Sequence, residues 1–253
     1  MKRYVQKLGL FLLLLGTWEL LTRVGVWSPH LFPGPLTVAE SLVAMVADGR
    51  MAQATLRSLG RLGRAYFMSV AIGIPLGLLM ARLAFFRNAV KPVVSGLQAL
   101  PSICWLPLAL LWFGLTDAAI LFVVVMGSVL SIAIATEDSV NGVDPQLLRV
   151  ASTLGVKGMR FQFGVVLPAA LPGIVTGLKL GWSFAWRALL AGELLFVSGG
   201  LGQLLTVGRE LMDVAQVMAV MVAIILIGMT VDRVLFQTVE GRLRRRWGLV
   251  DAL

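Results

Sequence analysis

Residues 118–136, AAILFVVVMGSVLSIAIAT, contain no Asp, Glu, Lys or Arg. A helix that crosses about 30 Å of hydrocarbon needs roughly 20 mostly apolar residues, and this segment has that length and composition. Three further segments without charges are residues 65–81, 92–116 and 214–231. A run from Leu8 to Leu21, in which Glu19 is the only charged residue, adds a candidate near the N-terminus. The sequence therefore predicts an all-α protein with several membrane-spanning helices.

The composition of the whole chain supports a membrane protein. Of its 253 residues 58% are hydrophobic and 14% are charged, whereas a typical soluble domain has about 25% charged residues. The net charge of +9 comes largely from residues that flank the apolar segments, which favours a lipid membrane over nucleic acid as partner. A single cysteine, Cys104, and a single histidine, His30, exclude a disulfide framework and a multi-histidine metal site. We therefore expect neither an average soluble enzyme nor a cofactor bound by this chain.

Basic residues predict the orientation of the spans, because Lys and Arg favour the cytoplasmic side of short loops. Four basic groups border the candidate spans: Lys2, Arg3 and Lys7; Arg82, Arg87 and Lys91; Arg149, Lys157 and Arg160; and Arg242 with Arg244 to Arg246. The segment 161–198, which contains Lys179, is long enough for one kinked span or two short ones. All four groups lie on one side only if this segment crosses once. We therefore expect six spans with both termini in the cytoplasm.

The N-terminal region is expected to stay in the protein as its first helix. A cleavable secretory signal is the alternative for residues 1–21, but no small-x-small cleavage site follows, and Trp18 and Arg23 fit poorly there. Trp27 then lies at the membrane interface. We expect one permease domain over residues 1–253, whose parts are 1–49 with the first helix and an outer helix, the core 50–240, a cytoplasmic loop 137–168 and a basic tail 241–253.

The segment between the first two spans predicts a short interfacial helix on the outer surface. Thr37 and Glu40 have the spacing of a capping box, and the helix is expected to end near Asp48–Gly49. The following helix enters the second span through Gly73, Pro75 and Gly77. Glycines there allow neighbouring helices to approach closely, and the proline allows a kink.

Residues 137–168 are more elaborate than a simple connection requires. The residues that mark the exit of the fourth span into water are Glu137, Asp138, Asn141, Gly142 and Asp144. Asp144–Pro145 is typical of an N-cap followed by proline at the first helical position. A short helix, Gln146–Leu154, and a second segment, Lys157–Val166, are expected on either side of Gly155, a helix stop. Their apolar and basic side chains predict a docking surface for a partner, and a helix lying on lipid is the alternative.

This loop resembles the signature of type I ABC importer permeases. The signature reads Glu-Ala-Ala, three residues, Gly, nine residues, Ile, one residue and Leu-Pro, and RVASTLG at 149–155 with VVLP at 165–168 keeps its spacing. Arg149, Val150 and Val165 depart from it. Further stretches similar to the family are SLGR at 58–61, GIPLG at 73–77 and GGLG at 199–202. Pro101, WLPL at 105–108 and WFG at 112–114 resemble the branch that imports nitrate, sulfonates, taurine or bicarbonate.

The resemblance implies a MetI-like fold in a bacterial cytoplasmic membrane, with a coupling helix in this loop that docks on a separate ATP-binding cassette ATPase. It assigns that role to Arg149, Ala151, Leu154, Gly155, Val156, Lys157, Arg160, Leu167 and Pro168. The chain lacks a GxxxxGK[ST] phosphate loop, so ATP and magnesium belong to the partner ATPase. A second permease copy, expected to be identical, and a periplasmic or extracellular solute-binding protein complete the importer that the resemblance implies.

Charged and aromatic residues supply the candidates for the translocation path: Arg57, Arg61, Arg64, Trp186, Arg187 and Glu193. The first three share one helical face and form either a basic funnel for an anion or contacts with headgroups and structural partners. Arg187 either attracts an anion in the path or satisfies backbone carbonyls, and Glu193 lines the path or holds the structure by hydrogen bonds. Trp182 and Trp186 form either an aromatic gate or ordinary packing.

Two other classes of function are compatible with such a chain. A secondary transporter or channel working without ATP usually needs buried ionisable groups or inverted repeats, and the sequence shows no repeat. A membrane enzyme needs a nucleophile with a base, or metal ligands, and no such cluster is visible. We therefore expect a non-catalytic permease subunit that forms the path for a small solute, an anion such as nitrate, a sulfonate, taurine or bicarbonate.

Overall fold

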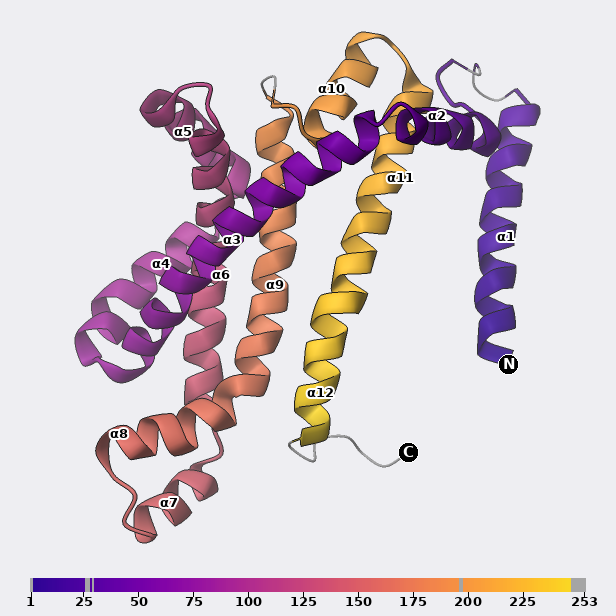
Figure 1. Cartoon of the computed structure of the whole chain (residues 1–253). Coiled ribbons are helices and arrows are strands. Elements are labelled where there is room, and N and C mark those ends of the chain that lie inside the picture. The colour runs from indigo at the N-terminus through magenta and orange to yellow at the C-terminus, as the bar shows by residue number, and fades with distance from the viewer. Residues whose placement is uncertain (1, 26–27, 29, 196–197, 247–253) are drawn as a thin grey trace. The chain divides into compact units, whose positions relative to one another are not determined.

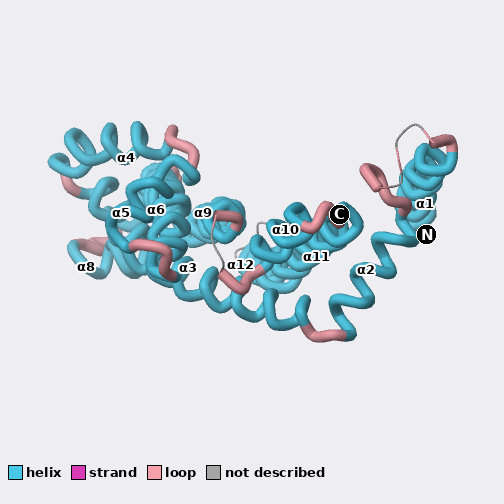
Figure 2. Tube along the Cα trace, turned by 90° about the horizontal axis from the view of Figure 1, so that it is seen from above, coloured by secondary structure: helices cyan, strands magenta, loops and turns pink. Residues whose placement is uncertain are grey.

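The computed structural model describes residues 2–25, 28, 30–195 and 198–246, and every regular element in these ranges is helical (Figures 1 and 2). The chain divides into two compact units, Met1–Ser58 with Glu193–Ile227, and Leu59–Gly192 with Gly228–Leu253. The predictions for Trp27 and for the tail beyond residue 246 lie outside the described residues.

The first unit contains α1 (Lys2–Arg23), α2 (Pro35–Ala47), the start of α3 (Arg50–Arg82), α10 (Leu201–Glu210) and most of α11 (Val214–Val231). The capping box predicted at Thr37 and Glu40 is wrong, because Gly34 is the N-cap and Pro35 starts the helix two residues earlier. The predicted end is confirmed, since Asp48 is the C-cap and Gly49 has a φ of +81°.

Helix α10 was not predicted from the charge pattern. It follows Gly199–Gly200 and precedes Asp213, whose carboxylate accepts a hydrogen bond from the Gln216 backbone N–H at 2.9 Å. The Gln216 side chain donates to the Leu204 carbonyl at 3.0 Å and so joins α11 to α10. A helix of 10 residues is too short to cross a membrane, so a search for long apolar segments overlooks it. Figure 1 shows α10 and α2 at the same end of this unit.

The second unit contains the remaining elements: the rest of α3, η1 (Phe86–Val90), α4 (Lys91–Gln98), η2 (Ser102–Trp105), α5 (Leu106–Phe113), α6 (Asp117–Asn141), α7 (Pro145–Thr153), α8 (Gly158–Phe161), η3 (Gln162–Val166), α9 (Leu167–Glu193), η4 (Asp232–Gln237) and α12 (Thr238–Arg246). Its central helix is α6, which contains the charge-free segment 118–136 and lies among α3, α4, α5 and α9 (Figures 1 and 2). The most apolar segment of the sequence therefore forms the centre of the unit.

Glycines bring the long helices of the second unit into contact with α6. A Cβ atom on Gly73 of α3 would lie 2.9 Å from the Ile132 side chain, which confirms the close approach predicted there. On the other side, a Cβ atom on Gly173 of α9 would lie 2.5 Å from the Ser139 hydroxyl. The positions in α3 and α9 at which an added Cβ would lie closer than 3.0 Å to an atom of α6 are Gly73, Gly77, Gly173, Gly177 and Gly181. Their spacing of four keeps them on one face of each helix, where small residues allow tight packing in a membrane.

Four helices in the described ranges are long and apolar enough to cross a membrane: Arg50–Arg82, Asp117–Asn141, Gly158–Glu193 and Val214–Leu243. The segment predicted to cross once, 161–198, is confirmed as a single helix as far as Glu193. The candidate span over 92–116 is not one straight helix, because Phe86–Gln98 and Ser102–Phe113 meet at an angle of 101°. Pro101 in extended backbone separates the two halves, since proline lacks the N–H that would continue the helix. The count in the described ranges is four, or five if the bent pair crosses as one broken span, and the six-span topology stays a prediction.

Candidate coupling surface and membrane-embedded charges

The loop after α6 forms two short helices, α7 and α8, which we call the two-helix knob (residues 144–161; Figure 1). The predicted N-cap is confirmed: the Asp144 carboxylate accepts a hydrogen bond from the Gln146 backbone N–H at 2.8 Å, and Pro145 follows at the first helical position. Gly155 has a φ of +76°, a left-handed conformation that L-residues with a side chain rarely adopt. The turn between the two helices therefore depends on this glycine.

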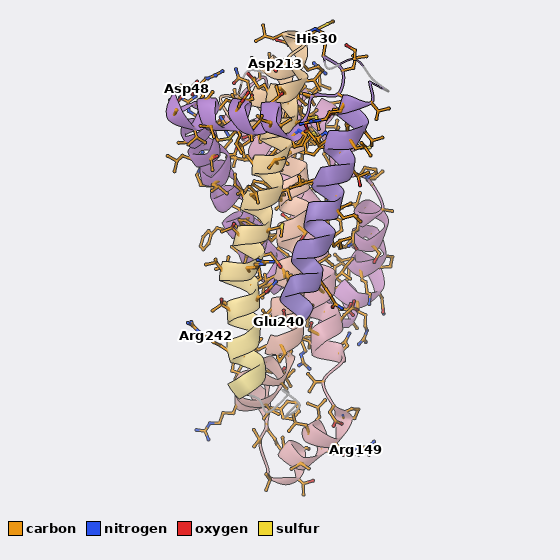
Figure 3. All side chains as sticks on the ribbon, turned by 90° about the vertical axis from the view of Figure 1, so that its right-hand side faces the viewer. His30, Asp48, Arg149, Asp213, Glu240 and Arg242 are labelled. Carbon is orange, nitrogen blue, oxygen red and sulfur yellow. The ribbon has the colours of Figure 1, made fainter. Side chains whose placement is uncertain are left out.

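The knob exposes apolar and basic side chains. Leu154, at the turn, is 77% exposed and Met159 is 71% exposed. Arg149, Lys157 and Arg160 are exposed beside them, and Figure 3 shows Arg149 on the knob. A folded chain rarely leaves a large apolar side chain so open next to others unless a partner covers it.

Not every residue assigned to coupling lies on this surface. Ala151 is buried, so its side chain is not part of the exposed surface of the knob. Val156 is half-buried, and Leu167 and Pro168 are half-buried at the start of α9. From Gly158 to Glu193 the helix is uninterrupted, through the π-helical turn η3. The second half of the knob is therefore continuous with the long helix α9.

An ion pair connects the bent helix pair to α6. The Lys91 Nζ atom lies 2.6 Å from Oε2 of Glu137, and the Asn141 amide donates to Oε1 of Glu137 at 2.6 Å. The prediction that Glu137 marks the exit into water is wrong, because this residue is fully buried. A buried carboxylate needs such partners, because an isolated charge is expensive to remove from water.

Replacing Lys91 by Met is expected to lower the free energy of unfolding by about 1–3 kcal/mol, because it leaves Glu137 buried without its cation. Adding Glu137→Gln removes the orphaned charge and restores much of the loss. Thermal unfolding of the detergent-solubilised protein measures both effects. Equal stability of wild type and Lys91→Met would show that the pair contributes nothing.

Two of the three arginines predicted as a funnel meet one carboxylate. Arg61 is only 6% exposed and binds Oδ1 of Asp117 through Nε at 3.0 Å and Nη2 at 2.8 Å. Arg64 is exposed, with Nη2 3.8 Å from Oδ2 of the same aspartate. Asp117 is the first residue of α6, where a negative charge also stabilises the helix dipole. Arg61 therefore binds a structural partner, which was the alternative to a basic funnel.

Glu193 supports the start of α10 in the first unit. The Ser58 hydroxyl lies 2.8 and 2.7 Å from its two carboxylate oxygens, and the Gly202 backbone N–H donates to Oε2 at 3.1 Å. Ser58 Oγ also accepts a hydrogen bond from the Leu201 backbone N–H at 2.9 Å. Glu193 is fully buried, and its carboxylate accepts from one first-turn N–H group of α10, that of Gly202. In the same unit, Arg57 is exposed and lines a cavity beside Gly199.

The aromatic and charged residues of α9 have separate neighbours. Trp186 is half-buried, and a Cβ atom on Gly228 would lie 3.6 Å from its indole nitrogen. Trp182 packs edge-on to Tyr66, with ring centroids 5.1 Å apart. Arg187 is exposed, and its guanidinium carbon lies 4.7 Å from the ring centroid of Phe184.

Sequence reasoning missed one ion pair between spans. The Lys179 Nζ atom of α9 lies 2.9 Å from Oδ1 of Asp232, at the start of the π-helical turn η4. Gln237 also donates to Oδ2 of Asp232 at 2.9 Å. A lone cation and a lone anion inside two apolar segments are a signal for such a pair, but nothing in the sequence shows that the two helices meet there.

These features define a class: an α-helical, multi-pass membrane protein with ion pairs between its long helices and an exposed two-helix knob. The chain belongs to the family described as "Binding-protein-dependent transport system inner membrane component", whose profile matches residues 73–245. It is the inner-membrane permease subunit of an ABC importer, and it is a non-catalytic component.

Relatives and solved structures agree with this assignment. The chain is 34% identical over 237 residues to a putative ABC transporter permease of Methanocaldococcus jannaschii, covering 92% of this chain and 88% of the relative. It is 28% identical over 230 residues to the taurine transport system permease TauC of Escherichia coli, covering 89% and 84%. An inward-facing structure of the MetNI methionine ABC transporter matches its fold with a TM-score of 0.62 at 20% identity, covering 78% of this chain and 95% of that chain.

Proposed function

We propose that this permease forms the membrane path for a small oxyanion, with sulfonates such as taurine as the first candidates. The main support is its similarity over nearly the whole chain to the taurine transport system permease. Arg57, which is exposed and lines a cavity, is consistent with an anionic solute, because positive charge in a cleft raises the local anion concentration. Nitrate and bicarbonate are the other candidates from the sequence resemblance.

Two copies of the chain bind two ATPase subunits in this proposal, and the two-helix knob is the contact. Its exposed apolar side chains are suited to a groove on the partner, and its basic side chains to acidic residues at the rim. In the second unit, Figure 1 shows the end of α12 at the same end as the knob. This arrangement supports a six-span topology in which the C-terminus and the knob both face the cytoplasm.

A reconstituted system tests the proposal. The permease, its ATPase and its solute-binding protein are placed in liposomes, and uptake of labelled taurine, nitrate, bicarbonate and methionine, which has no sulfonate, is compared. We expect uptake of an oxyanion that requires both ATP and the binding protein. Uptake of methionine alone contradicts the oxyanion assignment, and uptake that persists without the ATPase favours a secondary transporter.

A further inference from the structure

The break in the bent helix pair lies beside a small cavity. The chain turns by 101° between Phe86–Gln98 and Ser102–Phe113, within the apolar segment 92–116. Irregular backbone at membrane depth is tolerated where it is buried in protein or lines a water-filled cavity. A cavity of about 160 Å³ is present at this break, lined by residues 97–102, by α6 and by Phe184 of α9.

The polar side chains in the cavity wall have N–H and O–H groups that can donate hydrogen bonds. Gln98 donates from its side-chain amide to the Ser131 hydroxyl at 3.3 Å. The Ser131 hydroxyl keeps its own hydrogen, the Gln98 amide keeps a second N–H, and the Ser102 hydroxyl also lines the cavity. No acidic side chain is among the described residues that line it. Such a set of donors is suited to the oxygen atoms of an anion.

A positive charge lies behind the same wall. Phe184 lines the cavity, and the Arg187 guanidinium carbon lies 4.7 Å from the centroid of its ring. Arg187 donates from Nε to the Ser183 carbonyl at 3.2 Å and forms no ion pair with any carboxylate in the described ranges. A charged side chain within a membrane span is costly, which is why it usually has a functional role.

The size of the cavity suits a small solute. An engineered protein cavity of about 150 Å³ binds benzene, which has six non-hydrogen atoms. The cavity here has a similar volume, about 160 Å³. Nitrate, bicarbonate and taurine have about four to seven non-hydrogen atoms, so the cavity has room for each of them.

We propose that this cavity is a resting site for the transported oxyanion, held by Gln98, Ser102 and Ser131 and attracted by Arg187. The inference rests on the proposed function, because it takes the solute to be a small oxyanion. It goes beyond that function by placing one binding site within this chain, at the break of the bent helix pair.

Cysteine modification in the assembled importer tests access to the cavity. In a Cys104→Ser background, Ser131→Cys is treated with 2-sulfonatoethyl methanethiosulfonate, an anion, or with its trimethylammonioethyl counterpart, a cation. Each reagent's rate is divided by its rate with a free thiol. We expect this ratio to be at least about 10-fold higher for the anionic reagent than for the cationic one. We also expect taurine, nitrate or bicarbonate to slow the reaction of the anionic reagent. Adding Arg187→Gln removes the preference for the anion. Ser128→Cys is the matched control, because Ser128 is buried on the same helix and its hydroxyl bonds to Ser69 at 2.7 Å.

Reaction at Ser131→Cys without charge preference and without protection by taurine, nitrate or bicarbonate overturns the resting site. The same conclusion follows if Ser128→Cys reacts as fast as Ser131→Cys, because the reagent then does not report on the cavity.

Transport provides the second measurement. In the double variant Gln98→Leu with Ser131→Ala, oxyanion uptake per ATP hydrolysed is expected to fall at least about 10-fold, while stimulation of ATP hydrolysis by the loaded binding protein is retained. Retained stimulation shows that the variant is folded and docked. If wild type and variant import the oxyanion equally well, the resting site is wrong and the proposed function stands. If the wild type imports none of the three anions, the proposed solute class fails.

Discussion

Replacing Leu154 by Asp is expected to weaken binding between the permease and its ATPase at least about 100-fold, which corresponds to about 2.8 kcal/mol, and to abolish ATP-driven uptake. Leu154 is 77% exposed at the turn of the two-helix knob, so the substitution costs the fold of the permease little. An apolar side chain at the centre of an interface contributes much of its binding energy, and a carboxylate in its place has to be desolvated there.

Co-purification with a tagged ATPase measures this loss. Leu154→Met keeps an apolar side chain and is expected to retain the complex. Leu211→Asp is the second control, because Leu211 is 69% exposed but follows α10 in the first unit. Normal recovery of the ATPase with Leu154→Asp would show that the knob is not the contact. Labelling of the knob from the periplasmic side would also contradict the topology.

Replacing Gly77 by Val is expected to destabilise the permease by about 3 kcal/mol or more, so that little folded protein is recovered. A Cβ atom on Gly77 meets the Ala133 backbone carbonyl and lies 2.6 Å from the Thr136 Cβ atom. A backbone carbonyl in the middle of α6 cannot move aside as a flexible side chain does. The two helices therefore have to separate, and the contacts along their whole interface weaken.

Gly60→Ala on the same helix is the matched control, because a Cβ atom there has nothing within 4 Å in the described structure. We expect it to leave stability unchanged or to raise it slightly, since alanine favours helix over glycine by up to about 1 kcal/mol. Size-exclusion chromatography after heating of the detergent-solubilised protein compares the variants. Equal thermal resistance of Gly77→Val and Gly60→Ala would contradict tight packing between α3 and α6.

Much of the helical architecture could be predicted from the sequence, because the exclusion of charges from hydrocarbon acts on each segment separately. Residues 118–136 and 214–231 lie in long helices for this reason, and 161–193 forms one helix as the basic loops required. The knob was also predictable, since Asp144, Pro145 and Gly155 specify a cap and a turn through local backbone geometry. The bend after Gln98 was overlooked, although Pro101 was a signal for it.

The roles of individual charged residues depend on which helices meet. Glu137 follows an apolar segment and was expected in water, yet Lys91 and Asn141 surround it. Arg61 was a candidate for an open funnel, yet Asp117, 56 positions away, accepts its hydrogen bonds. Glu193 was expected to form structural hydrogen bonds or to line the path, and Ser58 and Gly202 are its partners.

By itself, the sequence determined that this chain is helical, lies in a membrane and carries the motifs of an importer subunit, because hydrophobicity, caps and signature spacing are properties of short segments. Only the tertiary structure decided which charges are paired, that the short helix α10 forms before α11, and how the bent helix pair lines a cavity beside α6. Those outcomes depend on contacts between residues far apart in the chain, such as Gln98 with Ser131, and the energy of such a contact is not encoded in either segment alone.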